Sequence, residues 1–519
     1  MPEISFDLNG TAVVLEDDGC SLLEALRDRL GVRSAKDGCS PQGQCGCCTV
    51  WVDGAPRVAC VTPLARVRSR TVTTIEGLDP GVATQWGNAL CASGGSQCGF
   101  CTPGIVMRLE AVRQTATAPL TVEQVDHAML AHLCRCTGWQ TIEDAARRVG
   151  EHDSAGALVW PGTRDAAAAE RRAAIEGGTA QRVNPDVALG LGGFADDTAP
   201  KDALIAVRRA DGEWEVADTL TEARKRAGKV QGRRTTEPLT WPVDVPQGAW
   251  HRVLQTTWVE PAYLEPDAAW CTPGGEPVSP LGNGGAFGGK VASQVGTIAR
   301  ELADRHGRPV RVLFSREDVV RLGPKRPPLA IGIHSDGTGV VHVVRTPGIT
   351  AAINSIAPQL QVVEVDVEGP PTSSAVRGAG WAEVAVVLAS LGEVDEVRSP
   401  DGAIASARID ADGTVHVRVS AGEVLDGVVL RSYCIGAAHM ALGWVRSEAI
   451  NVDAAGEVHD LTIRSFGALR AVDTPRIEVE IVDSPGPAVN GSDAVFAAVA
   501  AAAWRAAGLP ARWPTSRTV

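Results

Sequence analysis

The chain has 519 residues, 44% of them hydrophobic, which is enough for about three domains with sizeable cores. Its net charge of −13 argues against nucleic acid or an anionic membrane surface as a partner. The N-terminal stretch lacks the basic and apolar segments of a signal peptide, and no uncharged apolar run is long enough to span a bilayer. These features, with reduced rather than paired cysteines, predict a cytoplasmic protein.

The first 78 residues carry the signals of two hairpins and one helix. Alternating residues at 3–17 and at 48–61 are each divided by an Asn-Gly or Asp-Gly pair, the dipeptides that favour tight hairpin turns. Leucines at helical spacing fill 21–31, and a short strand is predicted at 71–77. Two hairpins packed on one helix predict a β-grasp, ferredoxin-like unit over residues 1–78.

This unit contains four cysteines with a spacing close to that of plant-type [2Fe–2S] ferredoxins: Cys39, Cys45, Cys48 and Cys60. The spacing departs by one residue, because five residues rather than four separate the first two cysteines. Glycines interleave with the thiols, and a loop that wraps a cluster needs such freedom to turn its N–H groups towards sulfur. The pattern predicts one [2Fe–2S] cluster.

From residue 79 to 150 the pattern becomes helical, with helices predicted at 82–92, 103–115, 121–133 and 141–149. Four more cysteines belong to this small bundle: Cys98, Cys101, Cys134 and Cys136. We expect them to hold a second [2Fe–2S] cluster between the turn before the second helix and the end of the third.

Zinc binding and disulfide formation are the two other uses of clustered cysteines. A four-cysteine zinc site usually shows two Cys-x2-Cys pairs, which neither group has, and thirteen cysteines are too few for a disulfide scaffold of this length. The remaining five are expected to be small buried hydrophobes: Cys20, Cys47, Cys91, Cys271 and Cys434. Cys47 lies between two ligands and could compete for iron. Cys48 is preferred because it keeps the Cys-x2-Cys spacing and begins a strand.

Residues 151–180 are predicted to be a linker, with an Ala-rich charged helix that stops at Gly177-Gly178. Residues 181–519 alternate between strands and helices and predict a mixed α+β region with its own core. The clearest strands are 202–209, 339–346, 403–410, 414–421 and 476–483, and the clearest helices are 291–306, 428–442 and 493–507.

The strings QCGFCTPG (97–104) and LCRCTGW (133–139), following a plant-type β-grasp unit, resemble the iron–sulfur module of the molybdenum hydroxylases, the xanthine oxidase and aldehyde oxidase family. The resemblance implies a multidomain α+β protein and an electron path from molybdenum through the helical-unit cluster and the β-grasp cluster to a flavin. It also implies that Gln97 lies beside the pterin of a molybdenum cofactor and that Cys136 is on the side facing that pterin.

Shorter strings in the second half resemble the molybdenum-binding portion of the same family, including the Gly-rich loop 282–290 and the Arg-Gly-x-Gly turn 377–380. Two departures stand out. Spacings between motifs are shorter than the family pattern, and Ser492 occupies the place of the family's catalytic Glu. A serine hydroxyl cannot act as that general base, and Asp493, one residue on, points in another direction. Asp426-Gly427 replaces the family's Gln-x-Gly motif.

The sequence therefore favours an electron-transfer subunit of a multi-subunit molybdenum hydroxylase, fused to a truncated, degenerate molybdopterin-binding-like region without an active site. A molybdopterin-binding catalytic subunit and an FAD-binding subunit are the expected partners, since no dinucleotide-binding Gly-x-Gly-x-x-Gly follows a strand here. The inert half could pair with a live molybdenum subunit across a pseudo-two-fold axis. The alternatives are a self-contained molybdopterin-dependent hydroxylase with an unusual base, and a binding protein with structural zinc.

Overall fold

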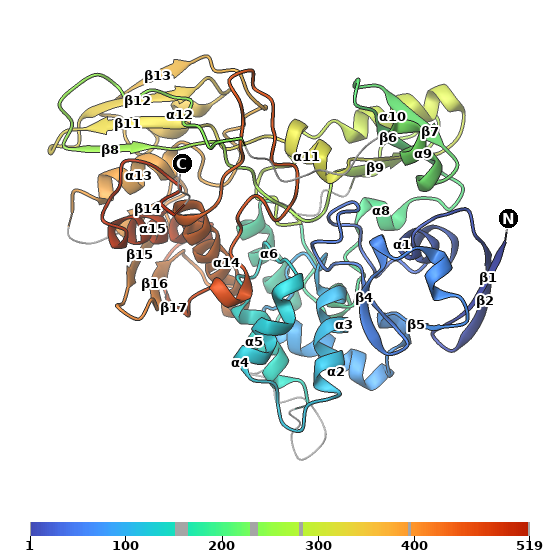
Figure 1. Cartoon of the computed structure of the whole chain (residues 1–519). Helices are drawn as coiled ribbons and strands as arrows, with labels where there is room; N and C mark the ends of the chain where they lie inside the picture. The colour runs from blue at the N-terminus through green and yellow to red at the C-terminus, as the bar shows by residue number, and fades with distance from the viewer. Residues whose placement is uncertain (1, 151–163, 229–236, 280–283, 393–395, 517–519) are drawn as a thin grey trace.

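A computed structural model describes residues 2–150, 164–228, 237–279, 284–392 and 396–516 (Figure 1). The blue and cyan first half places a small sheet beside a cluster of helices, and the green-to-red second half lies against both. We call residues 2–150 the first half and residues 164–516 the second half. The described residues form four sheets, one in the first half and three in the second. The mixed, multidomain α+β architecture predicted from the sequence is confirmed.

The first sheet has the strand order β2-β1-β5-β3-β4, with β1 parallel to β5 and all other pairs antiparallel. Both predicted hairpins are confirmed, and each turns through two residues with positive φ, for example Asn9 at +53° and Gly10 at +83°. The strands are β1 (Glu3–Leu8), β2 (Thr11–Glu16), β3 (Thr49–Val52), β4 (Ala55–Val58) and β5 (Thr71–Thr73). The helix α1 (Leu22–Glu24) continues as a π-helical turn over Ala25–Arg29.

The four helices predicted after the sheet are confirmed: α2 (Pro80–Ser93), α3 (Thr102–Arg113), α4 (Val122–Ala128) and α5 (Gln140–Arg148). Local capping explains their bounds. The Asp79 carboxylate accepts the N–H groups that open α2, and Gly94 closes it at a φ of +74°. The third helix is shorter than predicted, since α4 ends at Ala128 and gives way to a 3₁₀ turn.

The second half contains three four-stranded sheets, ordered β7-β6-β10-β9, β13-β12-β11-β8 and β14-β15-β16-β17. Their strands are β6 (Leu204–Arg208), β7 (Trp214–Ala217), β8 (Arg252–Gln255), β9 (Ala268–Cys271), β10 (Val310–Leu313), β11 (Leu329–Ile333), β12 (Gly339–Val344), β13 (Leu360–Val365), β14 (Glu396–Arg398), β15 (Ile404–Ile409), β16 (Val415–Ser420) and β17 (Ile477–Val482). The longer helices are α10 (Val295–His306), α13 (Trp381–Ala389), α14 (Gly427–Arg446) and α15 (Gly491–Ala506). The shorter ones are α7 (Pro185–Ala188), α8 (Ala195–Thr198), α9 (Leu220–Ala227), α11 (Arg316–Leu322) and α12 (Ile349–Asn354).

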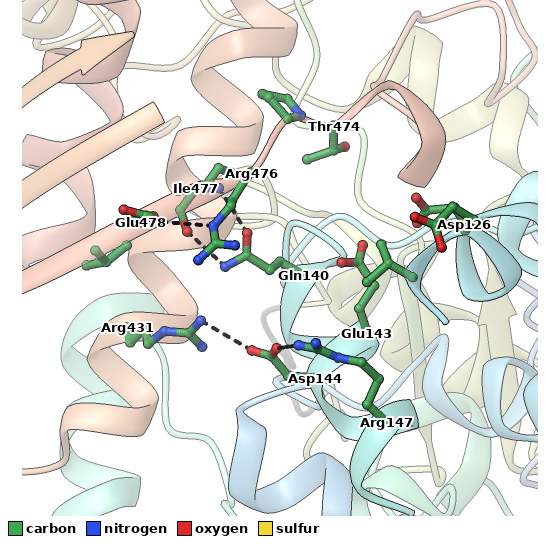
Figure 2. Close-up of a pocket in the computed structure, with 14 residues that line it drawn as sticks. Asp126, Gln140, Glu143, Asp144, Arg147, Arg431, Thr474, Arg476, Ile477 and Glu478 are labelled. Atoms are coloured by element: carbon green, nitrogen blue, oxygen red, sulfur yellow. Dashed lines mark hydrogen bonds and ion pairs between the residues drawn. The ribbon is translucent and has the colours of Figure 1, made fainter. Parts of the chain in front are cut away.

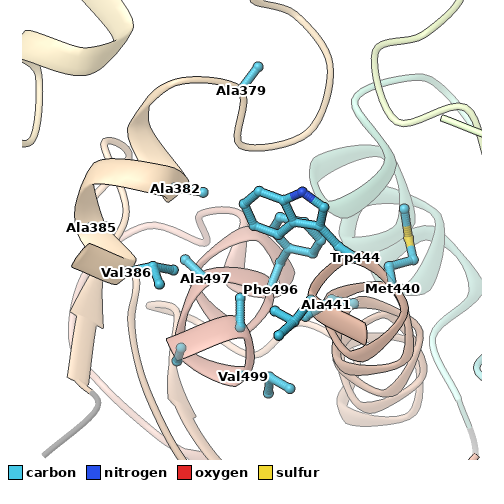
Figure 3. Packing of buried hydrophobic residues seen from close by; sticks show 14 of the residues in the cluster. Ala379, Ala382, Ala385, Val386, Met440, Ala441, Trp444, Phe496, Ala497 and Val499 are labelled. Carbon is cyan, nitrogen blue, oxygen red and sulfur yellow. The ribbon is translucent and has the colours of Figure 1, made fainter. Parts of the chain in front are cut away.

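The largest core surrounds α14 and α15. Figure 3 shows Trp444 of α14 over Phe496 of α15, with ring centroids 5.0 Å apart, and alanines filling the space beside them. The alanines of α15 let the two helices approach closely, so the long apolar runs of both helices are buried in the core. Among the described residues, α14 is the one helix whose length and composition would suit a bilayer, and 89% of that window is buried in the protein.

The described part of the predicted linker, residues 164–180, packs into the second half instead of connecting two separate units. Its helix is confirmed as α6 (Ala166–Gly177), which ends at Gly178 with φ +69°. However, Arg172 is fully buried and donates to the backbone carbonyls of Glu423, Val424 and Val489. From Ala166 onward the segment is therefore an integral part of the second half. Residues 151–163 lie outside the described residues.

A cleft of about 560 Å³ separates α4 and α5 from β17 and α14 (Figure 2). Gln140 crosses it with two hydrogen bonds to the backbone of Ile477, at 2.8 and 2.9 Å. Asp126 and Glu143 both line the helical side of the cleft, close enough to shift each other's pKa. Burial, followed by the charge of Asp126, raises the pKa of Glu143 to about 8.

Replacing Glu143 with glutamine is expected to stabilise the protein at high pH. The folded protein holds the Glu143 proton up to about pH 8, while the unfolded chain loses it near 4.5. The stability this group contributes is therefore complete below pH 4.5 and is lost as pH rises through 8. In urea unfolding, Glu143→Gln should raise the free energy of unfolding above that of the wild type by on the order of 2 kcal/mol at pH 8.5, and by little at pH 5.

The matched control is Glu123→Gln, which neutralises an exposed carboxylate on α4 in the same cleft lining. This variant should track the wild type at both pH values. An equal gain for Glu143→Gln at pH 5 and pH 8.5 would contradict the assigned protonation.

Candidate metal centre

The first cysteine set lies on the loop before β3 and just after β4. All four residues are buried, at 1%, 1%, 1% and 5% exposure for Cys39, Cys45, Cys48 and Cys60. The thiols are close enough to shift one another's pKa: Cys45 and then Cys60 lower that of Cys39, and Cys39 and Cys48 raise that of Cys60. The four sulfurs are thus contiguous, although Cys60 is distant in sequence, because the β3–β4 hairpin returns the chain to the loop.

Backbone N–H groups point at these sulfurs. The amide of Gln44 donates to Cys39 Sγ and that of Cys60 to Cys48 Sγ, both at 3.4 Å. Glycine is needed at position 46, where φ is +76° and a Cβ would collide with the His132 ring; a Cβ at Gly38 would stand 3.1 Å from Cys45 Sγ. Such amides stabilise negative charge on sulfur, so the loop suits four thiolates around a metal cluster.

The second set joins the turn before α3 to the chain after α4. Cys136 Sγ is 3.6 Å from Cys98 Sγ, and the Cys134 and Thr137 side chains are 3.1 Å apart. A hydrogen bond from Cys101 is the largest effect that lowers the pKa of Cys134, to about 6. Cys98 is half-buried, whereas its three companions are buried.

Each set therefore offers four clustered thiols with amide donors close by. Thiolate-only donor sets of this kind are what a [2Fe–2S] cluster takes, so the residues present fit two such clusters. When bound, such clusters would supply one-electron redox chemistry. The eight cysteines would hold them, and all but Cys98 are buried away from water.

The two sets are in direct contact through the backbone. The amide of Leu133, the residue before Cys134, donates to the carbonyl of Cys45 at 3.0 Å. A Cβ at Gly104 on α3 would collide with the carbonyl of Gly46, so α3 packs directly on the first loop. The sequence did not show this contact, which joins residues about ninety positions apart.

Cys47 is the spare thiol of the first loop. It is fully buried, its sulfur lies 3.9 Å from the carbonyl of Cys45, and it hydrogen-bonds with the Cys45 thiol. The thiols that shift the pKa of Cys60 most are those of Cys39 and Cys48, and not that of Cys47. Among the other spare cysteines three are buried as expected, while Cys91 is half-buried and lies beside Arg164.

Gln97 and Cys136 do not face outward. The Gln97 side-chain amide donates to the carbonyl of Cys136 at 3.0 Å and to Ser432 of α14 at 2.9 Å. A Cβ at Gly436 would collide with the Cys136 carbonyl, and one at Gly285 would lie 3.4 Å from its sulfur. This chain's own α14 and Gly-rich loop therefore pack on Cys136, on the side where the resemblance placed a pterin.

The molybdenum-like motifs of the second half do converge, around Arg377. Its guanidinium donates to Ser492 Oγ at 2.8 Å, pairs with Asp493 at 2.8 Å and lies 3.8 Å above the ring of Phe287 from the Gly-rich loop. Residues 282–283 of that loop lie outside the described residues. Burial raises the pKa of Asp493, but the carboxylate is held by Arg377. Among the described residues around Arg377, Asp493 is therefore not a free general base in place of the family's Glu.

A carboxylate missed by the sequence reasoning lies here. Glu176 of α6, 1% exposed, accepts the N–H groups of Gly491 and Ser492 at 3.1 and 2.8 Å and pairs with Arg172 at 3.0 Å. It caps α15 and is saturated by donors. No periodicity in an Ala-rich charged helix distinguishes this residue from its exposed neighbours. A cavity of about 360 Å³ lies beside this cluster, with Glu176, Phe287, Arg377 and Asp493 in its lining.

Comparison with known proteins finds iron–sulfur relatives for the first half of the chain. A family model described as a [2Fe-2S] binding domain matches residues 74–147. The nicotinate dehydrogenase small FeS subunit of Eubacterium barkeri is 36% identical over 146 residues, which cover 28% of this chain and 92% of that protein. The isoquinoline 1-oxidoreductase subunit alpha of Brevundimonas diminuta is 37% identical over 150 residues, 28% of this chain and 97% of that protein.

Larger relatives are matched only in part. The xanthine dehydrogenase of Emericella nidulans is 41% identical over 160 residues, so the matched segment spans 11% of that protein. Among solved structures, the aldehyde oxidoreductase from Desulfovibrio gigas is similar with a TM-score of 0.71, over 99% of each chain and at 15% identity. This similarity extends the shared fold to the second half, which the sequence comparisons do not cover.

Proposed function

This chain belongs to the molybdenum hydroxylase family, and we propose that it is the electron-transfer component of a multi-subunit oxidoreductase of that kind. In this proposal it holds two [2Fe–2S] clusters, through Cys39, Cys45, Cys48 and Cys60 and through Cys98, Cys101, Cys134 and Cys136. Electrons come from a molybdopterin centre in a partner subunit and leave to an FAD-binding partner. The isolated chain is not catalytic, and the cytoplasm is its proposed location.

The contact between the two cysteine sets supports this proposal most directly. Leu133 N–H to Cys45 C=O, at 3.0 Å, links the neighbour of one proposed ligand to another proposed ligand of the other cluster. Burial excludes water from seven of the eight cysteines, which favours reversible redox chemistry over loss of iron. Two buried clusters on touching loops are suited to passing single electrons.

The second half supports catalysis in another subunit. Ser492 stands at the place of the base, Asp493 is paired with Arg377, and Glu176 is saturated by N–H donors and Arg172. None of these groups is free to move a proton. The side of Cys136 that would face a pterin is filled by α14. We therefore assign to this half the role of a docked cover over the second cluster.

Metal analysis of the isolated chain tests the proposal. We expect four irons per chain, about two for each cluster, no molybdenum, and two distinct [2Fe–2S] EPR signals after reduction with dithionite. One molybdenum per isolated chain would instead indicate a self-contained enzyme. Zinc without visible absorption would indicate a structural metal and refute the electron-transfer role.

A further inference from the structure

A cavity of about 610 Å³ opens beside the second cysteine set. It lies between Cys98 on one side and α6 with the chain that follows it on the other, and its lining includes Glu170, Arg171 and Arg182. The volume is within the range of sites for small molecules, about 300–1,000 Å³. Cys98 is the one residue of the eight that is not buried.

The charge of the lining is positive. Arg182 donates to the carbonyl of Leu191 at 3.1 Å, and neither it nor Arg171 forms an ion pair within the described part of the chain. Glu170, the carboxylate of the lining, accepts the N–H of Val183 at 3.4 Å. Two unpaired guanidinium groups against one carboxylate make this a local positive site on a chain whose net charge is −13.

The opposite side of the same set is closed. Cys136 is 4% exposed, and α14 and Gly285 pack on its carbonyl and sulfur. Cys101 and Cys134 are 5% and 6% exposed. In the described part of the chain, Cys98 is therefore the ligand of the second set that a redox group can approach most closely.

We propose that this cavity seats a small anionic redox group, which exchanges single electrons with the second cluster through Cys98. The inference rests on the proposed function, since it needs a cluster at Cys98. In each exchange the group loses one electron and the cluster gains it, or the reverse, and no bond forms or breaks. Arg171 and Arg182 hold the negative charge, and Cys98 provides the contact.

Binding is tested first with hexacyanocobaltate(III), a redox-inert trianion, by calorimetry on the iron-loaded chain. Arg171→Glu/Arg182→Glu should weaken its binding at least tenfold. The control, Arg345→Glu/Arg418→Glu, makes the same charge change at side chains that are 58% and 62% exposed on the second-half sheets, and should bind as the wild type does. Equal weakening in both variants, or no binding to the wild type, would overturn the proposal.

Electron exchange is tested by oxidising the reduced chain and following the second cluster by freeze-quench EPR. The Arg171→Glu/Arg182→Glu variant should react at least tenfold more slowly with ferricyanide, an anion, and faster with hexaammineruthenium(III), a cation. Ala174→Trp, which fills the cavity from α6 without changing charge, should slow both reactions. If the rates are unchanged in a chain that shows both EPR signals, the cavity route is refuted and the proposed function still stands. If the second EPR signal is absent, the proposed function itself is refuted.

The native complex distinguishes two sources of the anionic group. If the group is a free carrier, hexacyanocobaltate should bind the isolated chain and the complex alike. If a partner subunit presents the group, the probe should bind only the isolated chain. Both results support the site, and failure to bind either form contradicts it.

Discussion

Replacing Cys48 with alanine is expected to remove the first [2Fe–2S] cluster and leave the second, whereas Cys47→Ala should leave both. The reason is geometric. Cys48 Sγ accepts the N–H of Cys60 and contacts its thiol, which in turn contacts Cys39, so Cys48 completes the set. Cys47 is one residue away, but its sulfur lies towards Cys45 and the second cysteine set.

Iron content and EPR measure the difference. Cys48→Ala should fall from four irons per chain to about two and lose one of the two reduced signals. Cys47→Ala removes a thiol from the same loop and is the matched control for packing, because both residues are buried. If Cys47→Ala loses a cluster while Cys48→Ala keeps two, the ligand assignment of the first set is wrong.

Much of the first half was predictable because its signals are local. A hairpin needs two residues with positive φ at its turn, and Asn-Gly and Asp-Gly supply them; a helix begins where Asp79 and Pro80 can open it. Strand alternation and cysteine spacing are also short-range, so the β-grasp sheet, the helices and both cysteine groups were found. The strands and helices predicted in the second half are confirmed for the same reason.

The environment of the site was not predictable, because long-range packing decides it. Gln97 hydrogen-bonds to Ser432, more than three hundred residues away, and Glu176 reaches the start of α15 across a similar separation. The sequence of α6 is that of an exposed linker helix, yet Arg172 is buried under carbonyls of other segments. Composition does not identify which polar residue of an Ala-rich helix is enclosed when that helix docks.

Arg135 connects the two halves at the second cysteine set. It lies between Cys134 and Cys136 in sequence, and its guanidinium donates to both carboxylate oxygens of Glu448, with Nη2 to Oε2 at 2.9 Å. Its Nε donates to the carbonyl of Pro261 at 3.0 Å. The side chains of Arg135 and Glu448 are 5% and 0% exposed, so this ion pair holds the second half against the loop without help from water.

Arg135→Met is therefore expected to lower the free energy of unfolding of the second half by about 3–5 kcal/mol, because it leaves Glu448 charged and buried. Urea unfolding measures this loss. The double variant Arg135→Met/Glu448→Met should recover much of that loss, since an apolar pair can replace a buried ion pair at little cost. Arg147→Met, which breaks an exposed pair with Asp144, is the matched control and should cost less than about 1 kcal/mol.

The same variants show whether the second half acts as a cover for the second cluster. In Arg135→Met the loosened contact should expose Cys136 to solvent. The EPR signal of the second cluster should then decay faster in air than that of the first cluster. The double variant, docked again, should restore the wild-type decay rate. If the loss of stability is restored by the second substitution but the fast decay is not, the docked half does not protect the cluster, and its proposed role as a cover fails.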